Sequence, residues 1–406
     1  MTPEPQAAAG ARPGPPAAPA RLTSLDAFRG AIMLYMASHG LSLGRVAQSL
    51  PDSIWPTLAW GFEHVAWTGC SPWDLIQPAF MFMVGVAVPY SYARRAEEGH
   101  TFRRQFAHAL VRAAVLVLLA VFLASGVGSG RTTRWEFTNV LGQIGLGYPC
   151  LLFLLNRRLS VQAAITAAIL VGYWALFALY PAPAAGFAYA GVGVTPTDLA
   201  GGAVREGFFA HWNKNSNVAA AFDLWFLNLF PRSSPFQFNP GGYATLNFVP
   251  SLATMILGLM SGELLRGPRP AGEKVRRLLW GGLGLVLVGV VAGYTVCPIV
   301  KRIWTPSWAL FSGGLVVWLL AAFYWVIDVA SYRRWPQFLV VVGMNSIAIY
   351  LMSQLMRPWM GEVLRTHLGA APFTGAYGPM VRDLLTLGVF WVILWWMHRR
   401  RIFLRI

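Results

Sequence analysis

The chain has 406 residues, of which 56% are hydrophobic and only 12% are charged. A soluble protein of this length needs many more charged side chains on its surface, so the composition excludes a soluble multidomain enzyme. The formal net charge of +16 does not indicate a nucleic-acid partner, because the basic residues fall in short clusters between apolar runs. That pattern is typical of the loops of a membrane protein.

Residues 1–20 are rich in Pro and Ala and are predicted to form a disordered tail. The remaining residues, 21–406, are predicted to form one transmembrane domain with an extracytoplasmic loop at about 181–243. A membrane-spanning helix needs roughly 20 mostly apolar residues. Ten segments qualify, at about 27–45, 72–93, 106–125, 138–155, 160–180, 244–265, 277–298, 306–330, 337–356 and 380–398. The sequence therefore predicts an all-α fold, a polytopic transmembrane helix bundle.

Lys and Arg residues predict the orientation of this bundle. If the N-terminus is cytoplasmic, 20 of the 32 basic residues fall in cytoplasmic segments and 11 in outside segments. The dense clusters all lie on the cytoplasmic side, as the positive-inside rule requires. We therefore expect cytoplasmic N- and C-termini and a multi-pass protein of the plasma (inner) membrane.

Candidate chemistry begins near the outer end of the first predicted span, at His39. An ionisable group within a span is a functional candidate, although a neutral histidine bonded to another helix is an alternative. Between the first two spans lie His64 and, after the helix-start signal Ser71-Pro72, Asp74. Histidine suits proton transfer near neutral pH, and a nearby carboxylate can orient its ring. The alternative is an interfacial histidine and an acid that stabilises the helix start.

Polar residues in later segments have local structural interpretations. Gln143 can join neighbouring helices, Asn239 begins a turn, and Asn345 can form an interhelical hydrogen bond. The sequence has no phosphate-binding G-x-x-x-x-G-K-[ST] loop and no cluster with the spacing of metal ligands, so no metal is expected.

Six blocks of sequence, in order, resemble the heparan-alpha-glucosaminide N-acetyltransferase family. The first looks like the family opening R-x-x-S-x-D-x-F-R-G, and the second is similar to its H-A-x-W-N-G and D-L-x-x-P motifs. The blocks lie at residues 21–30, 64–78, 140–145, 239–242, 304–307 and 343–346. The chain differs at Thr68, where the family has Asn, and at Gln143, where Arg is usual.

The resemblance implies transfer of an acetyl group from cytoplasmic acetyl-CoA to a sugar on the far side of the membrane. The family's implicated histidine matches His64. Acetyl-CoA is then the acyl donor, and the acceptor is a saccharide amine or hydroxyl. We expect substrate contacts in the matching blocks, at Trp67, Thr68, Gln143, Asn239 and Asn345.

Two basic pairs near span ends, Arg333 with Arg334 and Arg94 with Arg95, are candidates for binding the CoA phosphates, since the guanidinium fork suits phosphate. Charge that only sets the topology is the alternative.

The stretch from Asp26 to His39 also resembles integral-membrane O-acyltransferases, which makes His39 a second catalytic candidate. A transporter or flippase for a glycan or lipid-linked sugar is a further alternative, as is a non-catalytic scaffold. His64 could act as a general base or carry the acyl group itself. The expected partners are membrane lipid, acyl-CoA and a saccharide, not nucleic acid. The oligomeric state is left open, with a homodimer among the expectations.

Overall fold

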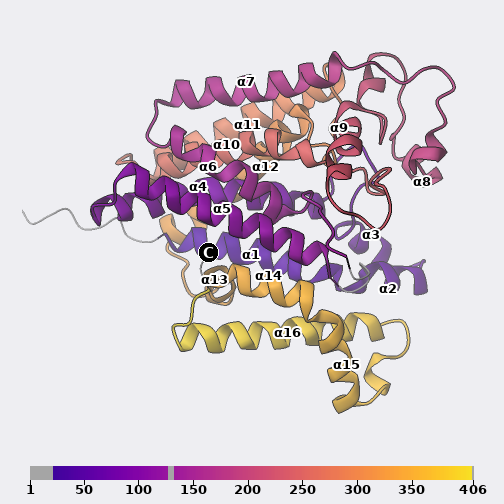
Figure 1. Ribbon diagram of the computed structural model, residues 1–406. Coiled ribbons are helices and arrows are strands. Elements are labelled where there is room, and N and C mark those ends of the chain that lie inside the picture. The colour runs from indigo at the N-terminus through magenta and orange to yellow at the C-terminus, as the bar shows by residue number, and fades with distance from the viewer. Residues whose placement is uncertain (1–21, 127–131, 405–406) are drawn as a thin grey trace, which may run out of the picture.

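The computed structural model describes residues 22–126 and 132–404. These residues form helices and connecting segments, with a single isolated β-bridge between Thr68 and Val300. The all-α class predicted from sequence is confirmed (Figure 1). The predicted tail at residues 1–20 lies outside the described residues.

Within the described ranges, seven helical segments are long and apolar enough to cross a membrane. An eighth span results if α13 and α14, which meet at a 77° bend, are counted as one. The seven contain α4 (Ile76–Glu97), α5 (Phe102–Ala124), α7 (Leu159–Ala178), α10 (Phe248–Arg266), α11 (Ala271–Thr295), α12 (Pro306–Phe323) and α16 (Gly378–Arg399). The bent pair consists of α13 (Gln337–Met344) and α14 (Ser346–Leu355). The polytopic bundle therefore has fewer full-length spans than the ten predicted.

The difference lies in the first and fourth predicted spans. These correspond to α1 (Thr23–Ala37) and α6 (Val140–Leu154), which have only 15 residues each. Helix α1 stops before His39–Ser42, where four consecutive residues have φ between 48° and 70° and form a left-handed turn. The sequence stays largely apolar through this turn, so hydropathy alone overestimates the length of the helix. Both short helices still pack within the bundle, α1 against α13 and α6 against α5 and α10.

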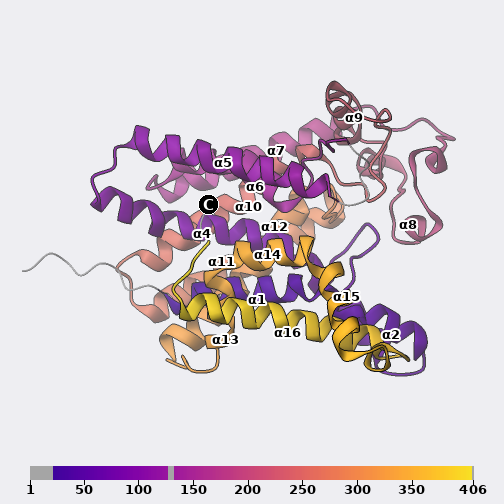
Figure 2. The same cartoon turned by 60° about the horizontal axis from the view of Figure 1, so that its bottom comes forward.

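The long helices lie side by side, and a group of shorter helices lies at one end of the bundle, to the right in Figures 1 and 2. These short helices are α2 (Leu43–Ser49), α3 (Trp55–Trp60), α8 (Pro196–Ala200), α9 (Val218–Phe226) and α15 (Arg357–Leu368). We call residues 181–243 the cap, and the end of the bundle that carries it the cap end. The cap contains α8 and α9 and has a buried ion pair, with Lys214 Nζ 2.6 Å from Asp198 Oδ2.

Helix α4 is held tightly against α10. A Cβ atom at Gly85 would lie 1.9 Å from the carbonyl oxygen of Met255, and one at Gly258 would lie 2.0 Å from that of Phe82. Glycines at such crossings let two helix backbones approach closely inside a membrane. The contact fixes the position of α4, and therefore of the turn at its N-terminal end that carries Asp74.

Candidate functional site

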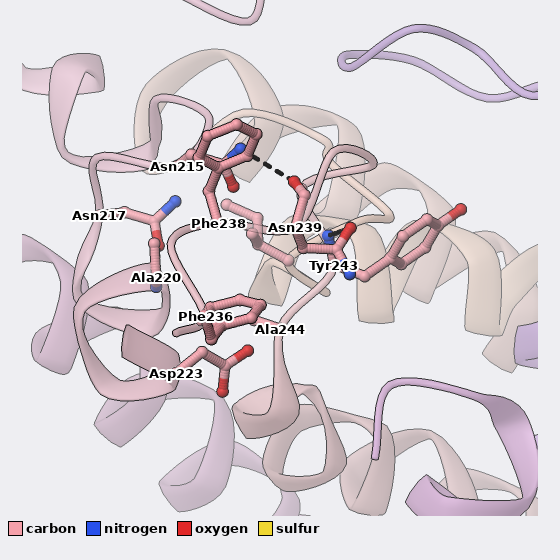
Figure 3. A pocket seen from close by; sticks show the side chains of 11 residues that line it. Asn215, Asn217, Ala220, Asp223, Phe236, Phe238, Asn239, Tyr243 and Ala244 are labelled. Atoms are coloured by element: carbon pink, nitrogen blue, oxygen red, sulfur yellow. Dashed lines mark hydrogen bonds between the residues drawn. The ribbon is translucent and has the colours of Figure 1, made fainter. Parts of the chain in front are cut away.

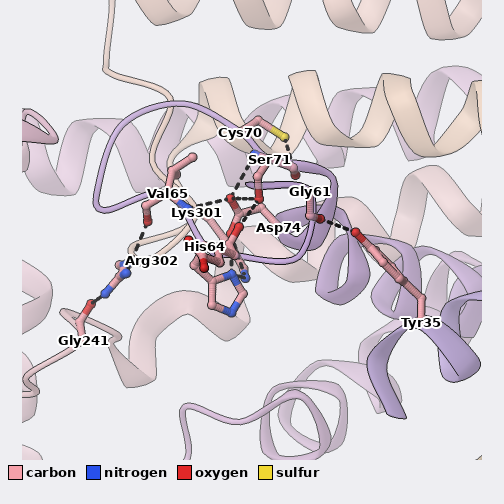
Figure 4. Close-up of polar contacts among 11 residues, drawn as sticks. Tyr35, Gly61, His64, Val65, Cys70, Ser71, Asp74, Gly241, Lys301 and Arg302 are labelled. Carbon is pink, nitrogen blue, oxygen red and sulfur yellow. Dashed lines mark hydrogen bonds and ion pairs between the residues drawn. The ribbon is translucent and has the colours of Figure 1, made fainter. Parts of the chain in front are cut away.

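The structure brings His64 and Asp74 together at the cap end (Figure 4). His64 Nδ1 lies 2.7 Å from Asp74 Oδ1. Asp74 is in η2 (Pro72–Leu75), the turn that leads into α4, and its side chain is 1% exposed. The His64 side chain is 38% exposed, so one side of the imidazole remains accessible.

Local sequence explains how Asp74 is held. Its Oδ2 accepts hydrogen bonds from the backbone N–H of Ser71 at 3.1 Å, the Ser71 hydroxyl at 3.0 Å and the Val65 N–H at 3.3 Å. Ser71 and Asp74 form the capping arrangement expected at a helix start. Asp74 therefore caps the helix with one oxygen and contacts His64 with the other, so its role at the helix start is compatible with orienting the imidazole.

Lys301 completes this cluster from a distant part of the chain. Its Nζ lies 3.2 Å from Asp74 Oδ1 and 3.1 Å from His64 Nδ1, and its side chain is 5% exposed. A buried carboxylate and a buried ammonium are each costly alone and compensate one another as a pair. Lys301 thus allows Asp74 to remain ionised beside the imidazole.

The contacts indicate which nitrogen of His64 carries the proton. Nδ1 lies 2.7 Å from the carboxylate of Asp74, which only accepts, and 3.1 Å from the ammonium of Lys301, which only donates. The contact with Asp74 is the shorter, and Lys301 can donate to Asp74 Oδ1 instead, so we assign the hydrogen to Nδ1 and the free lone pair to Nε2. Burial lowers the pKa of His64, and the positive charges of Lys301 and Arg302 lower it further, against the opposing effect of Asp74. Since the usual value is about 6.5, the ring is neutral at physiological pH and Nε2 can accept a proton.

Aromatic rings lie beside the imidazole. The ring centroids of His64 and Trp73 are 6.4 Å apart, and Trp73 also contacts Phe62 and Tyr35, at 5.9 and 4.9 Å. The Tyr35 hydroxyl donates a hydrogen bond to the carbonyl of Gly61. The three rings are partly exposed and give the site an apolar wall.

Two predicted substrate contacts next to His64 have structural partners. The Trp67 side chain is 1% exposed and packs in the core beneath the cap. Thr68 donates from both its N–H and its hydroxyl to the carbonyl of Gly201, at 3.2 and 3.0 Å. Both residues therefore attach the His64 segment to the cap.

Asn239 lies in the cap rather than beside His64. Its side-chain oxygen accepts hydrogen bonds from the N–H groups of Gly241 and Tyr243, and its carbonyl accepts one from Asn215. It lines a pocket of about 10 Å³, shown in Figure 3, that has room for about one water molecule. A saccharide does not fit this pocket as it stands.

Gln143 and Asn345 are buried and hydrogen-bonded. Gln143 accepts a hydrogen bond from Gln77, one turn after Asp74 in α4, at 3.2 Å. Asn345 lies at the bend between α13 and α14 and binds the C-terminal segment through Ile402 and Leu404, both at 3.0 Å. Gln143 thus contacts α4 near the turn that carries Asp74. Asn345 instead holds the C-terminal segment against the bend between α13 and α14.

His39 forms part of a separate polar group. Its Nε2 is buried with no hydrogen-bond partner among the described residues. It lies in the left-handed turn, near the ion pair of Arg357 with Asp383, whose Nη2 and Oδ2 are 2.6 Å apart. Ser42 Oγ donates to the same carboxylate at 2.5 Å. Within the described structure, no hydrogen bond or ring contact joins His39 to His64.

The predicted phosphate-binding arginines lie at the surface. Arg94 pairs with Glu98 at 3.5 Å, and Arg95 lies over the ring of Tyr92, 5.2 Å from its centroid. Arg333 and Arg334 are exposed in the connection between α12 and α13. Their assignment to CoA stays a prediction.

Lys301 and its neighbour Arg302 were missed by sequence reasoning. Arg302 donates to the carbonyls of Gly241 and Val65, at 2.7 and 3.3 Å, and so joins the cap to the His64 segment. The one available signal was a pair of basic residues on the side predicted to be extracytoplasmic, directly before the motif at residues 304–307. A basic pair there runs against the charge bias of the other loops.

The chain is distantly similar in sequence to two known proteins. No family model matches the chain. It is 22% identical over 376 residues to heparan-alpha-glucosaminide N-acetyltransferase from Homo sapiens, and 22% identical over 372 residues to the same protein from Mus musculus. Each alignment covers 82% of this chain and 53% of the relative, so the chain spans about half the length of these curated relatives. The similarity is distant and suggests the same family as the sequence motifs.

Proposed function

We propose that this protein is a membrane acyltransferase. It moves an acetyl group from acetyl-CoA on the cytoplasmic side to an amine or hydroxyl of a saccharide on the extracytoplasmic side. The distant similarity to membrane N-acetyltransferases supports a transferase-type function in general. The cluster of His64, Asp74 and Lys301 is the observation on which we base the assignment of this activity to the site.

His64 acts as the general base in this proposal. Its Nε2 takes the proton from the acceptor N–H or O–H as the nitrogen or oxygen attacks the thioester carbonyl. The C–S bond then breaks, and the CoA thiolate leaves and is protonated. Asp74 holds Nδ1–H and stabilises the imidazolium that forms, and Lys301 balances the charge of Asp74.

A covalent route uses the same residues. Nε2 attacks the thioester first, CoA leaves, and the acyl-imidazole passes its acyl group to the acceptor. The two routes differ in whether CoA is released before the acceptor arrives. Rapid mixing with acetyl-CoA alone distinguishes them: a burst of free CoA equal to the enzyme, with an acetylated His64 peptide in mass spectrometry, requires the covalent route.

The aromatic wall of Tyr35, Phe62 and Trp73 supports a saccharide acceptor. The faces of sugar rings are apolar enough to pack on aromatic side chains, while the hydroxyls remain hydrated. The wall lies beside His64, where an acceptor must be held for proton transfer.

A transporter is the other class of function considered. Such a protein uses broken helices whose exposed backbone binds the substrate. Here the break between α13 and α14 is filled by the bonds of Asn345 to the C-terminal segment. Because the C-terminal segment already occupies this break, the break supports a transport site less well, and the proposed enzyme is favoured.

The direct test uses detergent-purified full-length protein with labelled acetyl-CoA and amino sugars or envelope glycans. We expect CoA release that depends on the acceptor and a product heavier by one acetyl group in mass spectrometry. Envelope glycans from cells with and without the protein should differ by the same mass. Absence of both changes, with well-folded protein, contradicts the proposal.

A further inference from the structure

A second pocket lies at the end of the bundle opposite the cap. Its volume is about 390 Å³, and it is lined by Pro89, Asn156, Arg157, Glu263, Arg266 and Gly267. These residues come from α4, the connection between α6 and α7, and the C-terminal end of α10. Pro89 is 15 residues beyond Asp74, which on a helix corresponds to about 22 Å. The pocket is therefore separated from His64 by most of the length of α4.

Two arginines give this pocket its positive charge. Arg157 donates from its Nε to the carbonyl of Phe153 at 3.3 Å, and this bond does not use its two terminal nitrogens. Within the described residues, neither Arg157 nor Arg266 forms an ion pair with a carboxylate. Guanidinium groups with unused donors at the rim of a pocket suit phosphate, which accepts two parallel hydrogen bonds.

The one carboxylate in the lining is already engaged. Glu263 Oε1 accepts the N–H of Asn156 at 2.8 Å, and Oε2 accepts the side-chain N–H of Gln162 at 2.9 Å. Both oxygens thus hold the connection that carries Arg157. Glu263 therefore holds the backbone beside Arg157, and its two oxygens are used by Asn156 and Gln162.

We infer that this pocket binds the phosphate groups at the nucleotide end of the acyl donor. The inference rests on the proposed acyltransferase function. A CoA thioester carries its phosphates and its reactive carbonyl at opposite ends of the long pantetheine arm, so it needs two binding regions that lie far apart. The pocket is on the side predicted to be cytoplasmic. His64 lies near the opposite, N-terminal end of α4, beside Asp74.

Binding of CoA to the full-length protein in nanodiscs, measured by calorimetry, tests this inference. Arg157→Gln with Arg266→Gln should weaken CoA binding roughly ten-fold to a hundred-fold, through the loss of charged hydrogen bonds. Binding of pantetheine, which has no phosphate, should not change. Arg103→Gln with Arg104→Gln, an exposed pair at the same end of the bundle, removes equal charge and should leave CoA affinity intact.

Each other outcome overturns the inference in a distinct way. Unchanged CoA affinity in the Arg157/Arg266 variant rejects the pocket and leaves the proposed function standing. A wild-type protein that binds no CoA rejects both. If the variant loses copurified anionic lipid while keeping its CoA affinity, the pocket binds lipid headgroups. If the loss follows Arg333→Gln with Arg334→Gln instead, the donor binds at that pair.

Discussion

Three side chains, one from each of three segments of the chain, divide the roles in the proposed site. In the proposed mechanism, His64 supplies the lone pair that accepts the proton, Asp74 holds the ring, and Lys301 balances the charge of Asp74. Only His64 is substantially exposed, at 38%, whereas the other two are buried. We therefore propose that His64 meets the substrate and that Asp74 and Lys301 are positioning residues.

Lys301→Met should change the pH dependence of acyl transfer. Because the pKa of His64 lies below its usual value, wild-type activity should persist to pH values below about 6.5 and fall as Nε2 becomes protonated. Removing the nearby positive charge raises the pKa of His64, so the acid limb of kcat/KM should move to higher pH. Lys301→Arg should restore the wild-type profile. A Lys301→Met protein with lower stability but an unmoved acid limb gives Lys301 a structural role alone.

Asp74→Asn should reduce turnover less than loss of His64 itself. An amide keeps a hydrogen-bond partner for Nδ1 but no longer stabilises an imidazolium by charge. It can also donate to Nδ1 and so select the wrong tautomer. Single-turnover rates at saturating acetyl-CoA measure this. A loss equal to that of His64→Ala would mean that the pair acts only as a unit.

His39→Ala separates the two arrangements that the sequence suggested. His39 belongs to the group with Asp383 and Arg357. If His64 is the base, this variant should keep acyl transfer within a few-fold of wild type. Severe loss here, with His64→Ala near wild type, would favour the O-acyltransferase arrangement.

The predictability of these residues follows from sequence distance. His64 and Asp74 are ten positions apart and share a helix start, so sequence alone could bring them together. Lys301 is 227 positions from Asp74, and no local pattern reports that contact. Thr68 and Asn345 lie in blocks that resemble the family, but their hydrogen-bond partners come from the cap and the C-terminal segment, which the position of a motif does not reveal.

At the scale of helices, the crossing of α4 and α10 places the site. Gly85→Ala should destabilise the protein, because its Cβ would meet the backbone of Met255, which cannot move without displacing α10. Overpacking of this kind costs about 1–3 kcal/mol, more than an alanine gains in helix propensity. Thermal unfolding in detergent measures the difference. Gly281→Ala in α11, where nothing lies within 4 Å, is the matched control and should be neutral or slightly stabilising, through the gain in helix propensity. Equal melting temperatures for the two variants would contradict the tight crossing.

Helix boundaries were harder to predict than helix identity. Hydropathy located most of the long helices, because long apolar runs have few other structures in a membrane. It failed at the end of α1, where the left-handed turn at His39–Ser42 interrupts a run that stays apolar. It also could not show that α13 and α14 bend by 77°, since Asn345 is a single polar residue within an apolar stretch.

At the scale of the whole molecule, the account requires a defined orientation. Tags at residues 99 and 271 should be cytoplasmic, and one at residue 215 should be extracytoplasmic, because the dense basic clusters mark the cytoplasmic side. Accessibility labelling of intact cells tests all three. A cytoplasmic residue 215 would put the cap and His64 on the same side as acyl-CoA and remove the need for transfer across the membrane.

The central claim is that His64 is the base in acyl transfer, and one comparison tests it most directly. Full-length wild type, His64→Ala and the control His367→Ala, an exposed histidine of α15, are purified to matched monodispersity. Acceptor-dependent transfer from labelled acetyl-CoA is then measured. Since a general base supplies typically 10²–10⁴-fold in rate, His64→Ala should lose at least about two orders of magnitude, while His367→Ala keeps the wild-type rate. Wild-type turnover in His64→Ala would contradict the account and leave His64 an interfacial histidine.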